Sequence, residues 1–218
     1  MRPEVPGDWL ERLARVPSTA RPEELSRFLP PESGGRPSAV LMLFGADDAG
    51  QPDVLLTQRA PSMRSHAGQV SFPGGSLDPG DDGPVDAALR EAHEEAGVVR
   101  EGVEVLGELP SLFLPPSGFV VTPVLAWWRE PSPVAAVDPG EVARVDRVPL
   151  AELLDPANRV TARHPSGYLG PAFTVRGLFV WGFTAGLLSR VLDLAGLTFP
   201  WQRERVVDLP ADVLALLR

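Results

Sequence analysis

The chain has 218 residues, 44% of them apolar and 22% charged, a composition that is typical of a folded globular protein and argues against disorder. The absence of cysteine excludes disulfide bonds and thiolate metal sites, and the net charge of -9 argues against general nucleic-acid binding. The first residues, MRPEVPGDWLERLARV, contain no apolar core behind a basic segment, so we expect no signal peptide, no membrane partner and a cytoplasmic location. A small phosphorylated ligand remains compatible with this charge, because a divalent cation can supply positive charge locally.

The N-terminal part of the chain predicts two short helices, over 8–16 and 22–29, because apolar residues recur there every three or four positions. An apolar run at 39–44 and a second run that begins at Val54 flank a turn-rich segment, which predicts the two strands of a hairpin. From 59 to 83, glycine, proline, serine and aspartate interrupt any periodicity. A loop of this length inside a domain is uncommon and usually functional.

The next helix is predicted between Pro84 and Gly97, since proline favours the first helical position and glycine the position after the last turn. It carries three glutamates, Glu91, Glu94 and Glu95, which face one another across one turn. They occupy the C-terminal half, where the helix dipole prefers cations. They could form a solvated face, as most charge runs do. The alternative is a bound Mg²⁺ or Mn²⁺, since such hard cations take carboxylate oxygens as ligands.

The rest of the chain predicts further strands and helices around this acidic helix. The strands are expected at 103–109, 119–128 and 142–148, and the helices at 150–154 and 178–194. Pro123 inside the second of these strands indicates an edge position or a bulge. The order of elements predicts one mixed α/β (α+β) domain over 1–218, with helices on both sides of its sheet. Its core is expected at about 37–194, preceded by a helical extension at about 7–29.

The stretch from Gly74 to Val98, GG-SLDPGDD-GPVDAAL-REAHEEAGV, resembles the signature box of the Nudix hydrolases. That box joins a glycine, an acidic residue and the run Arg-Glu-apolar-x-Glu-Glu-x-Gly-apolar across a loop, a helix and a loop. The first half departs from the pattern, because it is one residue longer and its acidic position is an aspartate, Asp81 or Asp82. The second half is matched by Arg90, Glu91, Glu94, Glu95, Gly97 and Val98, with the small Ala92 in the apolar slot.

The segment just upstream, LLTQRAPSMRSHAGQVSFPGG, is similar to the signature of the coenzyme A pyrophosphatase branch of that family. The signature reads Leu-Leu-Thr-x-Arg-Ser/Ala, then an arginine, a glycine and Phe-Pro-Gly-Gly, each after three further residues. The eleven fixed positions are all met, by Leu55, Leu56, Thr57, Arg59, Ala60, Arg64, Gly68, Phe72, Pro73, Gly74 and Gly75. The resemblance as a whole covers about 37–194.

This resemblance implies a Nudix-type fold, with a mixed sheet between helices, and a Mg²⁺- or Mn²⁺-dependent pyrophosphatase with a small-molecule substrate. The implied reaction splits the diphosphate linkage of coenzyme A, and possibly of its derivatives, into 3',5'-ADP and 4'-phosphopantetheine. The alternative substrates are ADP-ribose and dinucleoside polyphosphates. A catalytically silent domain that senses a nucleotide is a further alternative, against which the presence of Glu91 and Glu95 argues.

The same resemblance implies roles for the residues of the acidic helix. Glu91 and Glu95 are expected to be direct metal ligands, and Glu94 a third ligand or a partner through water. Arg90 is expected to orient Glu94 by an ion pair. The base that activates water is expected to be Glu94 or, second, Glu141, for which a charged position at a strand edge is an equal alternative.

Arg59 and Arg64 are the candidate contacts for the anionic groups of the substrate, since guanidinium groups bind phosphate with two hydrogen bonds. The alternative is that one of these arginines braces the loop by bonding to backbone carbonyls. Gly74 and Gly75 are expected to let the backbone turn tightly toward the acidic helix beside the substrate.

Overall fold

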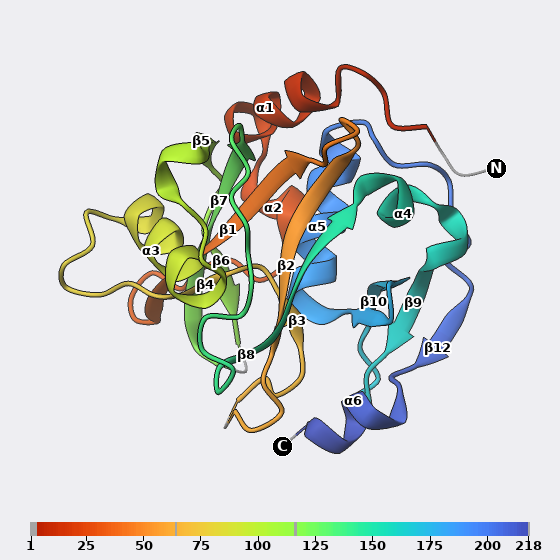
Figure 1. Cartoon of the computed structure of the whole chain (residues 1–218). Coiled ribbons are helices and arrows are strands. Elements are labelled where there is room, and N and C mark those ends of the chain that lie inside the picture. Colours follow the sequence, from red (N-terminus) through yellow and green to blue (C-terminus); the bar gives the residue numbers. More distant parts are fainter. Residues whose placement is uncertain (1–3, 64, 116, 218) are drawn as a thin grey trace.

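The computed structural model describes residues 4–63, 65–115 and 117–217, drawn in colour in Figure 1. Arg64, one of the two predicted ligand contacts, lies outside these residues. The helices are α1 (Trp9–Thr19), α2 (Pro22–Leu25), α3 (Pro84–Ala96), α4 (Leu150–Leu154), α5 (Gly182–Leu194) and α6 (Ala211–Leu216), with 3₁₀ turns η1 (Arg100–Gly102) and η2 (Pro156–Asn158). The strands are β1 (Arg36–Ala46), β2 (Pro52–Arg59), β3 (Val70–Ser71), β4 (Gly74–Ser76), β5 (Val103–Glu108), β6 (Leu112–Leu114), β7 (Phe119–Trp128), β8 (Val142–Pro149), β9 (Arg159–Arg163), β10 (Leu169–Val175), β11 (Leu178–Val180) and β12 (Val206–Asp208).

The larger of two sheets is mixed, and β1 is its central strand. It runs antiparallel to β2 and parallel to β7, within the main path β3-β2-β1-β7-β5. β4 also pairs with β1, β6 with β7, and β8 with β2. The predicted hairpin of the first two apolar runs is confirmed, with Phe44 opposite Val54. Strands β9 to β12 form a second sheet in the order β11-β10-β9-β12, which the sequence did not predict.

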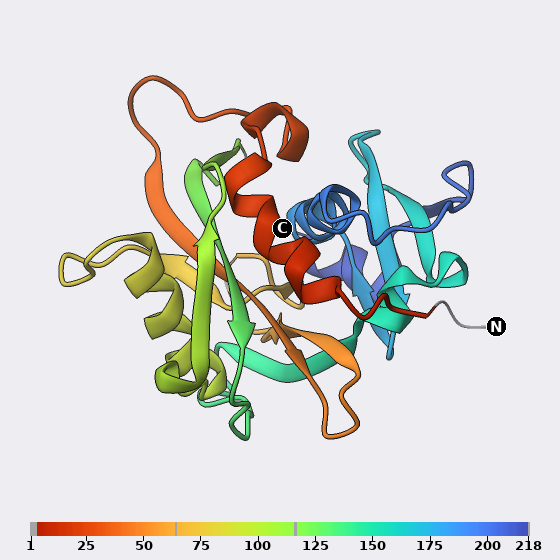
Figure 2. The ribbon, with the colours of Figure 1, turned by 90° about the horizontal axis from the view of Figure 1, so that it is seen from above.

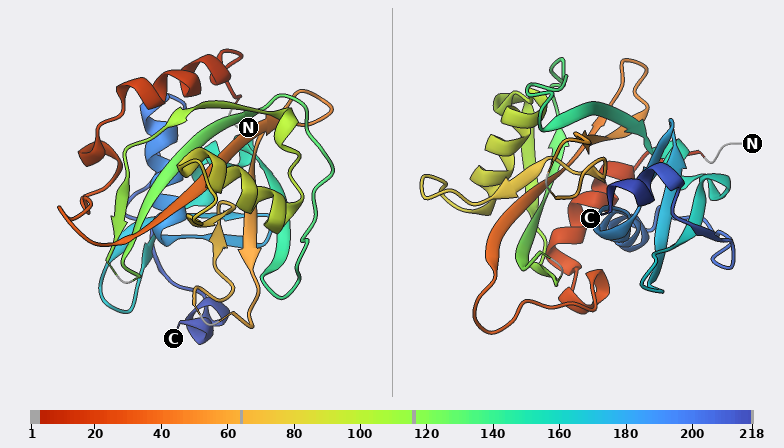
Figure 3. Two further views of the ribbon diagram at one scale, coloured as in Figure 1. Left: turned by 90° about the vertical axis from the view of Figure 1, so that its left-hand side faces the viewer. Right: turned by 90° about the horizontal axis from the view of Figure 1, so that it is seen from below.

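The elements are stacked in layers, which the view from above shows most clearly (Figure 2). Helix α3 covers one face of the larger sheet, and α1 and α5 lie between its other face and the smaller sheet (Figures 2 and 3). The predicted α/β fold, with a mixed sheet between helices, is therefore confirmed. Among the described residues, none of the helices combines the length and hydrophobicity needed to cross a lipid bilayer.

Strand β1 is buried on both faces, which explains its uninterrupted apolar sequence. Leu41 and Leu43 belong to the hydrophobic cluster under α3, whereas Met42 and Phe44 belong to the cluster shared with α1 and α5. Successive side chains of a strand point to opposite faces, so both faces need apolar residues when both are covered. Each of these four side chains is fully buried.

The face of α3 that contacts the sheet is made of alanines. Ala88, Ala92 and Ala96 follow one another at intervals of four residues, and all three are fully buried against the sheet. Such small side chains let a helix lie close to the strands beneath it. This packing explains why the small Ala92 fills the apolar slot, and it puts Glu91 and Glu95 at the border of the buried face.

Enlarging this contact should destabilise the fold. Ala92→Leu inserts three carbon atoms between α3 and the sheet, and overpacking of a filled core costs about 1–3 kcal/mol of unfolding free energy. Urea denaturation of the variant beside Ala135→Leu, at an exposed position, measures this effect. Equal stability of both variants would contradict the close packing of α3.

The expectation for Pro123 was wrong, because β7 is neither an edge strand nor bulged at this residue. It lies between β1 on one side and β5 and β6 on the other. The Pro123 carbonyl accepts a hydrogen bond from the Leu109 amide, in the gap between β5 and β6. The amide and carbonyl of one strand residue point to the same side of the strand. The position of the missing proline N–H therefore also faces the gap between β5 and β6, where no strand is present to accept a hydrogen bond from it.

Three further boundaries differ from the prediction. The apolar run from Leu178 begins as strand β11, and the helix starts only at Gly182, since a short apolar run does not distinguish a buried strand from a helix. Helix α2 ends at Leu25, where Ser26 turns extended and its hydroxyl accepts from the Phe28 amide. The long loop after Arg59 contains β3 and β4, which are too short to show a periodicity.

Candidate active site

Glu95 is the most buried carboxylate of the acidic helix, with 6% of its surface exposed. Its Oε2 accepts a hydrogen bond of 3.3 Å from the Gly74 amide, and its Oε1 lies 3.8 Å from Nη1 of Arg59. Burial raises the pKa of Glu95 to about 7, and the nearby charges of Glu91 and Glu141 act in the same direction. Helix α3 therefore holds a carboxylate whose charge is poorly compensated by the protein itself.

Glu91 lies one turn earlier on α3 and is also largely removed from water, with 19% of its side chain exposed. Its Oε1 accepts from Nη1 of Arg90 at 3.1 Å, yet burial still raises its pKa. The predicted pair at positions i and i+4 thus forms two neighbouring, partly desolvated carboxylates, beside the backbone of β4.

The two glycines at the start of β4 let this strand lie close to both of its neighbours, β1 and the acidic helix. Gly74 has a φ of 158°, and a β-carbon there would lie 2.7 Å from Cα of Val40 on the neighbouring strand. A β-carbon at Gly75 would overlap the carboxylate of Glu91. Gly75 therefore lets β4 lie this near to the acidic helix, and Gly74 lets the same strand lie close against β1.

Arg90 joins the loop before α3 to the carboxylates on it. Its Nε and Nη2 donate to the two carboxylate oxygens of Asp81 at 2.9 and 3.0 Å, and its Nη1 donates to Oε2 of Glu94 at 3.0 Å. Its Nη2 also donates to the carbonyl of Ser76 at 3.1 Å. The arginine lowers the pKa of the Asp81 carboxyl, which is 3% exposed. The predicted ion pair with Glu94 is present, but the main partner of Arg90 is Asp81.

Asp81 is the residue that the sequence left undecided. Two adjacent aspartates could occupy the acidic position of the signature, and their spacing did not distinguish them. In the structure Asp81 faces Arg90, whereas the Asp82 amide donates to Asp86 at the start of α3. The acidic position of the signature box pointed to these two aspartates. Only the path of the loop shows that Asp81 is the one that pairs with Arg90.

Glu141 lies at the same end of the larger sheet as Arg59, immediately before β8. Its carbonyl accepts a hydrogen bond of 2.8 Å from the Ala60 amide, and its side chain is exposed. Its charge contributes to the raised pKa of Glu95, which places it in the electrostatic neighbourhood of the acidic helix. Among the described residues, the buried Nε of Arg59 has no hydrogen-bond partner, whereas its Nη1 lies 3.8 Å from Oε1 of Glu95.

The donor set of this site fits a hard divalent cation. In the part of the chain that the structure describes, no three acidic or histidine side chains already converge as a metal cluster. Glu91 and Glu95 bond instead to Arg90 and to the Gly74 amide. Their oxygens are the ligands that Mg²⁺ and Mn²⁺ prefer, and a bound cation would offset the cost of burying both charges.

Comparison with known proteins agrees with this geometry. A family profile described as NUDIX domain matches residues 35–167. The chain is 42% identical over 148 residues to a protein of Cronobacter sakazakii described as uncharacterized Nudix hydrolase NudL, covering 65% of this chain and 74% of that protein. The protein of the same description from Escherichia coli K12 is 40% identical over 148 residues, with the same coverage.

A solved structure has a similar fold, the Nudix hydrolase RenU from M. smegmatis. It is 22% identical, with a TM-score of 0.53, and the match covers 78% of this chain and 92% of that one. The family profile and the two relatives show that the chain belongs to the Nudix hydrolase family. Its class of reaction is the hydrolysis of a pyrophosphate bond.

The raised pKa of Glu95 predicts how the stability of the metal-free protein depends on pH. Its pKa is about 7 in the fold against an ordinary 4.5, so between these values the folded state binds more protons than the unfolded chain. The free energy of unfolding should therefore fall as the pH rises through this window, by at most about 3 kcal/mol. Urea denaturation in a chelator at about pH 5 and about pH 8 measures this fall. Glu95→Gln should remove most of it, and an unchanged fall in that variant would exclude Glu95 as its source.

Proposed function

We propose that the chain hydrolyses the diphosphate linkage of coenzyme A to 3',5'-ADP and 4'-phosphopantetheine, with Mg²⁺ or Mn²⁺ as cofactor. One observation carries this proposal. The segment that matches the coenzyme A pyrophosphatase signature contributes two groups that contact the Glu95 carboxylate, the Arg59 guanidinium and the Gly74 amide. The segment whose sequence indicates the substrate therefore also forms part of the carboxylate site.

Each side chain then has a defined task. Glu91 and Glu95 would hold the metal, with Glu94 as a third ligand or a partner through water. When bound, the divalent ion neutralises the diphosphate oxygens and lowers the pKa of the attacking water. Arg59, whose guanidinium lies 3.8 Å from Glu95, contacts an anionic group of the substrate, and Arg64 is proposed to assist it.

The base that takes the proton from water is Glu94 or Glu141. Glu94 accepts a hydrogen bond from Nη1 of Arg90 at 3.0 Å, so one of its carboxylate oxygens is already engaged. The exposed Glu141 lies beside the Ala60 backbone at the sheet end that carries Arg59. Replacing each in turn by glutamine distinguishes them, because only loss of the base removes the acidic limb of the pH profile of kcat.

A direct assay tests the substrate. The full chain is incubated with coenzyme A, ADP-ribose or a diadenosine polyphosphate, with Mg²⁺, with Mn²⁺ or with a chelator, and the products are identified. We expect 3',5'-ADP and 4'-phosphopantetheine from coenzyme A, and no turnover in the chelator. Preferential cleavage of ADP-ribose or of the dinucleotide would assign the alternative substrate. Cleavage of coenzyme A in the chelator would contradict the metal-dependent mechanism.

Two broader expectations belong to this proposal. Coenzyme A or a related nucleoside diphosphate derivative is the expected partner, and the cytoplasm the expected place of action, a reducing compartment with which the lack of cysteine is compatible. We also propose that 1–218 forms one domain. The hydrophobic cluster that joins Leu13 of α1, Phe44 of β1 and Leu188 of α5 supports this view.

A further inference from the structure

Arg159, the first residue of β9, is a buried cation with few partners and lies outside the acidic helix. Its side chain is 1% exposed, and its Nη2 donates to Oγ of Ser189 at 2.6 Å. Among the described residues, neither its Nε nor its Nη1 has a hydrogen-bond partner, and Asp193 of α5, whose charge favours the cation, forms no ion pair with it. A guanidinium group carries five N–H donors, so most of its hydrogen-bonding capacity is unused.

Two aromatic rings surround this cation without satisfying it. The guanidinium carbon lies 4.8 Å from the ring centre of Trp201 and 5.1 Å from that of Phe173. Aromatic faces attract a cation, but they accept hydrogen bonds only weakly. Burial lowers the pKa of Arg159 to about 10, so the group still carries its charge at neutral pH. A charge buried in this way is costly unless an anion pairs with it.

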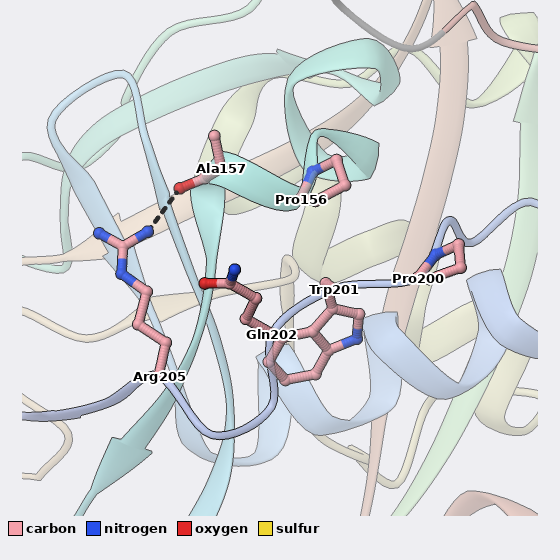
Figure 4. Close-up of a pocket in the computed structure, with 6 residues that line it drawn as sticks. All are labelled: Pro156, Ala157, Pro200, Trp201, Gln202 and Arg205. Carbon is pink, nitrogen blue, oxygen red and sulfur yellow. Dashed lines mark hydrogen bonds between the residues drawn. The ribbon is translucent and has the colours of Figure 1, made fainter.

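The indole that covers Arg159 also lines a pocket of about 480 Å³. Figure 4 shows this pocket between η2 and the segment that follows α5, where Nη1 of Arg205 donates to the Ala157 carbonyl at 3.0 Å. The carboxamide of Gln202 extends toward Arg205 (Figure 4). In the part of the chain that the structure describes, the buried Nε1 of Trp201 has no hydrogen-bond partner, and none of the residues that line the pocket is acidic. The pocket and its wall thus offer hydrogen-bond donors and positive charge.

We propose that this pocket binds a small oxyanion, the phosphate or carboxylate group of a metabolite, and that the Trp201 indole is a movable wall between it and Arg159. When the indole shifts, the anion accepts hydrogen bonds from Nε and Nη1 of Arg159. Phosphate and carboxylate are the groups whose paired oxygens match a guanidinium fork. The volume lies within the range of small-molecule sites. This site is separate from the carboxylates of α3 and does not depend on the substrate proposed above.

Thermal denaturation of the full, metal-free chain tests the site. The melting temperature is measured in sodium phosphate, sodium acetate and sodium chloride at equal ionic strength. We expect phosphate or acetate to raise it by several degrees above chloride, and the more effective anion identifies the ligand group. Arg159→Met should raise the anion concentration that gives half of the maximal stabilisation by about tenfold or more. Arg163→Met, at an exposed arginine of the same strand, should leave it unchanged.

Two results would overturn the proposal. One is the same stabilisation in Arg159→Met, which would place the anion elsewhere, for example at Arg59. The other is no stabilisation beyond chloride. If Arg159→Met does not fold, crystals of the unaltered chain soaked in phosphate decide the question. Phosphate within hydrogen-bond distance of Nε or Nη1 of Arg159 supports the proposal, and water alone beside these atoms overturns it.

Discussion

Glu95→Gln should lower kcat for pyrophosphate hydrolysis by about a thousandfold or more, which corresponds to about 4 kcal/mol of transition-state stabilisation. The amide keeps the size of the side chain and can still accept from the Gly74 amide, but it is a poor ligand for Mg²⁺. The fold should remain intact, and the metal-free variant should be more stable than the unaltered chain above about pH 7.

Steady-state kinetics at saturating Mg²⁺, together with circular dichroism and urea denaturation, measure both effects. Glu104→Gln on β5 is the matched control, because it makes the same change at an exposed position. Full activity in Glu95→Gln would remove Glu95 from the site. Lost activity together with lost stability would mean that the residue supports the fold rather than the reaction.

The second large effect is expected from the pair of Arg90 and Asp81. Arg90→Lys keeps the charge but loses the planar fork that binds both oxygens of Asp81, so it should not behave as a conservative change. Residues that hold metal ligands in place typically account for about 10- to 100-fold in activity. We therefore expect a loss of this size in kcat/KM, with weaker Mg²⁺ activation, and a similar loss in Asp81→Asn.

A double-mutant cycle tests whether the two residues act as one unit. If they do, kcat/KM of the double variant Arg90→Lys/Asp81→Asn should be no more than about twofold below that of the less active single variant. Arg100→Lys is the matched control, since Arg100 pairs with Asp86 at the other end of α3. Additive losses would show that Arg90 and Asp81 act separately. A comparable loss in Arg100→Lys would attribute the effect to the stability of the helix.

Much of the fold was predictable because its signals are local. Pro84 and Gly97 delimit α3, and the double-sided burial of β1 produces a continuous apolar run. Pro123 misled the prediction, because its place in the middle of the sheet depends on a gap between β5 and β6. The second sheet was missed because β11 and β12 have three residues each, a length with no resolvable period, and because Gly170 and Pro171 interrupt the pattern of β10.

The sequence by itself determined the carboxylates of α3, since a helix fixes which side chains three and four positions apart are neighbours. Only the tertiary structure decided that Asp81 pairs with Arg90, that Arg59 lies against Glu95, and that burial raises the pKa of that glutamate to about 7. Neighbours along a helix follow from backbone geometry alone. Desolvation and contacts between distant segments depend on how loops close and strands pair, which no local pattern encodes.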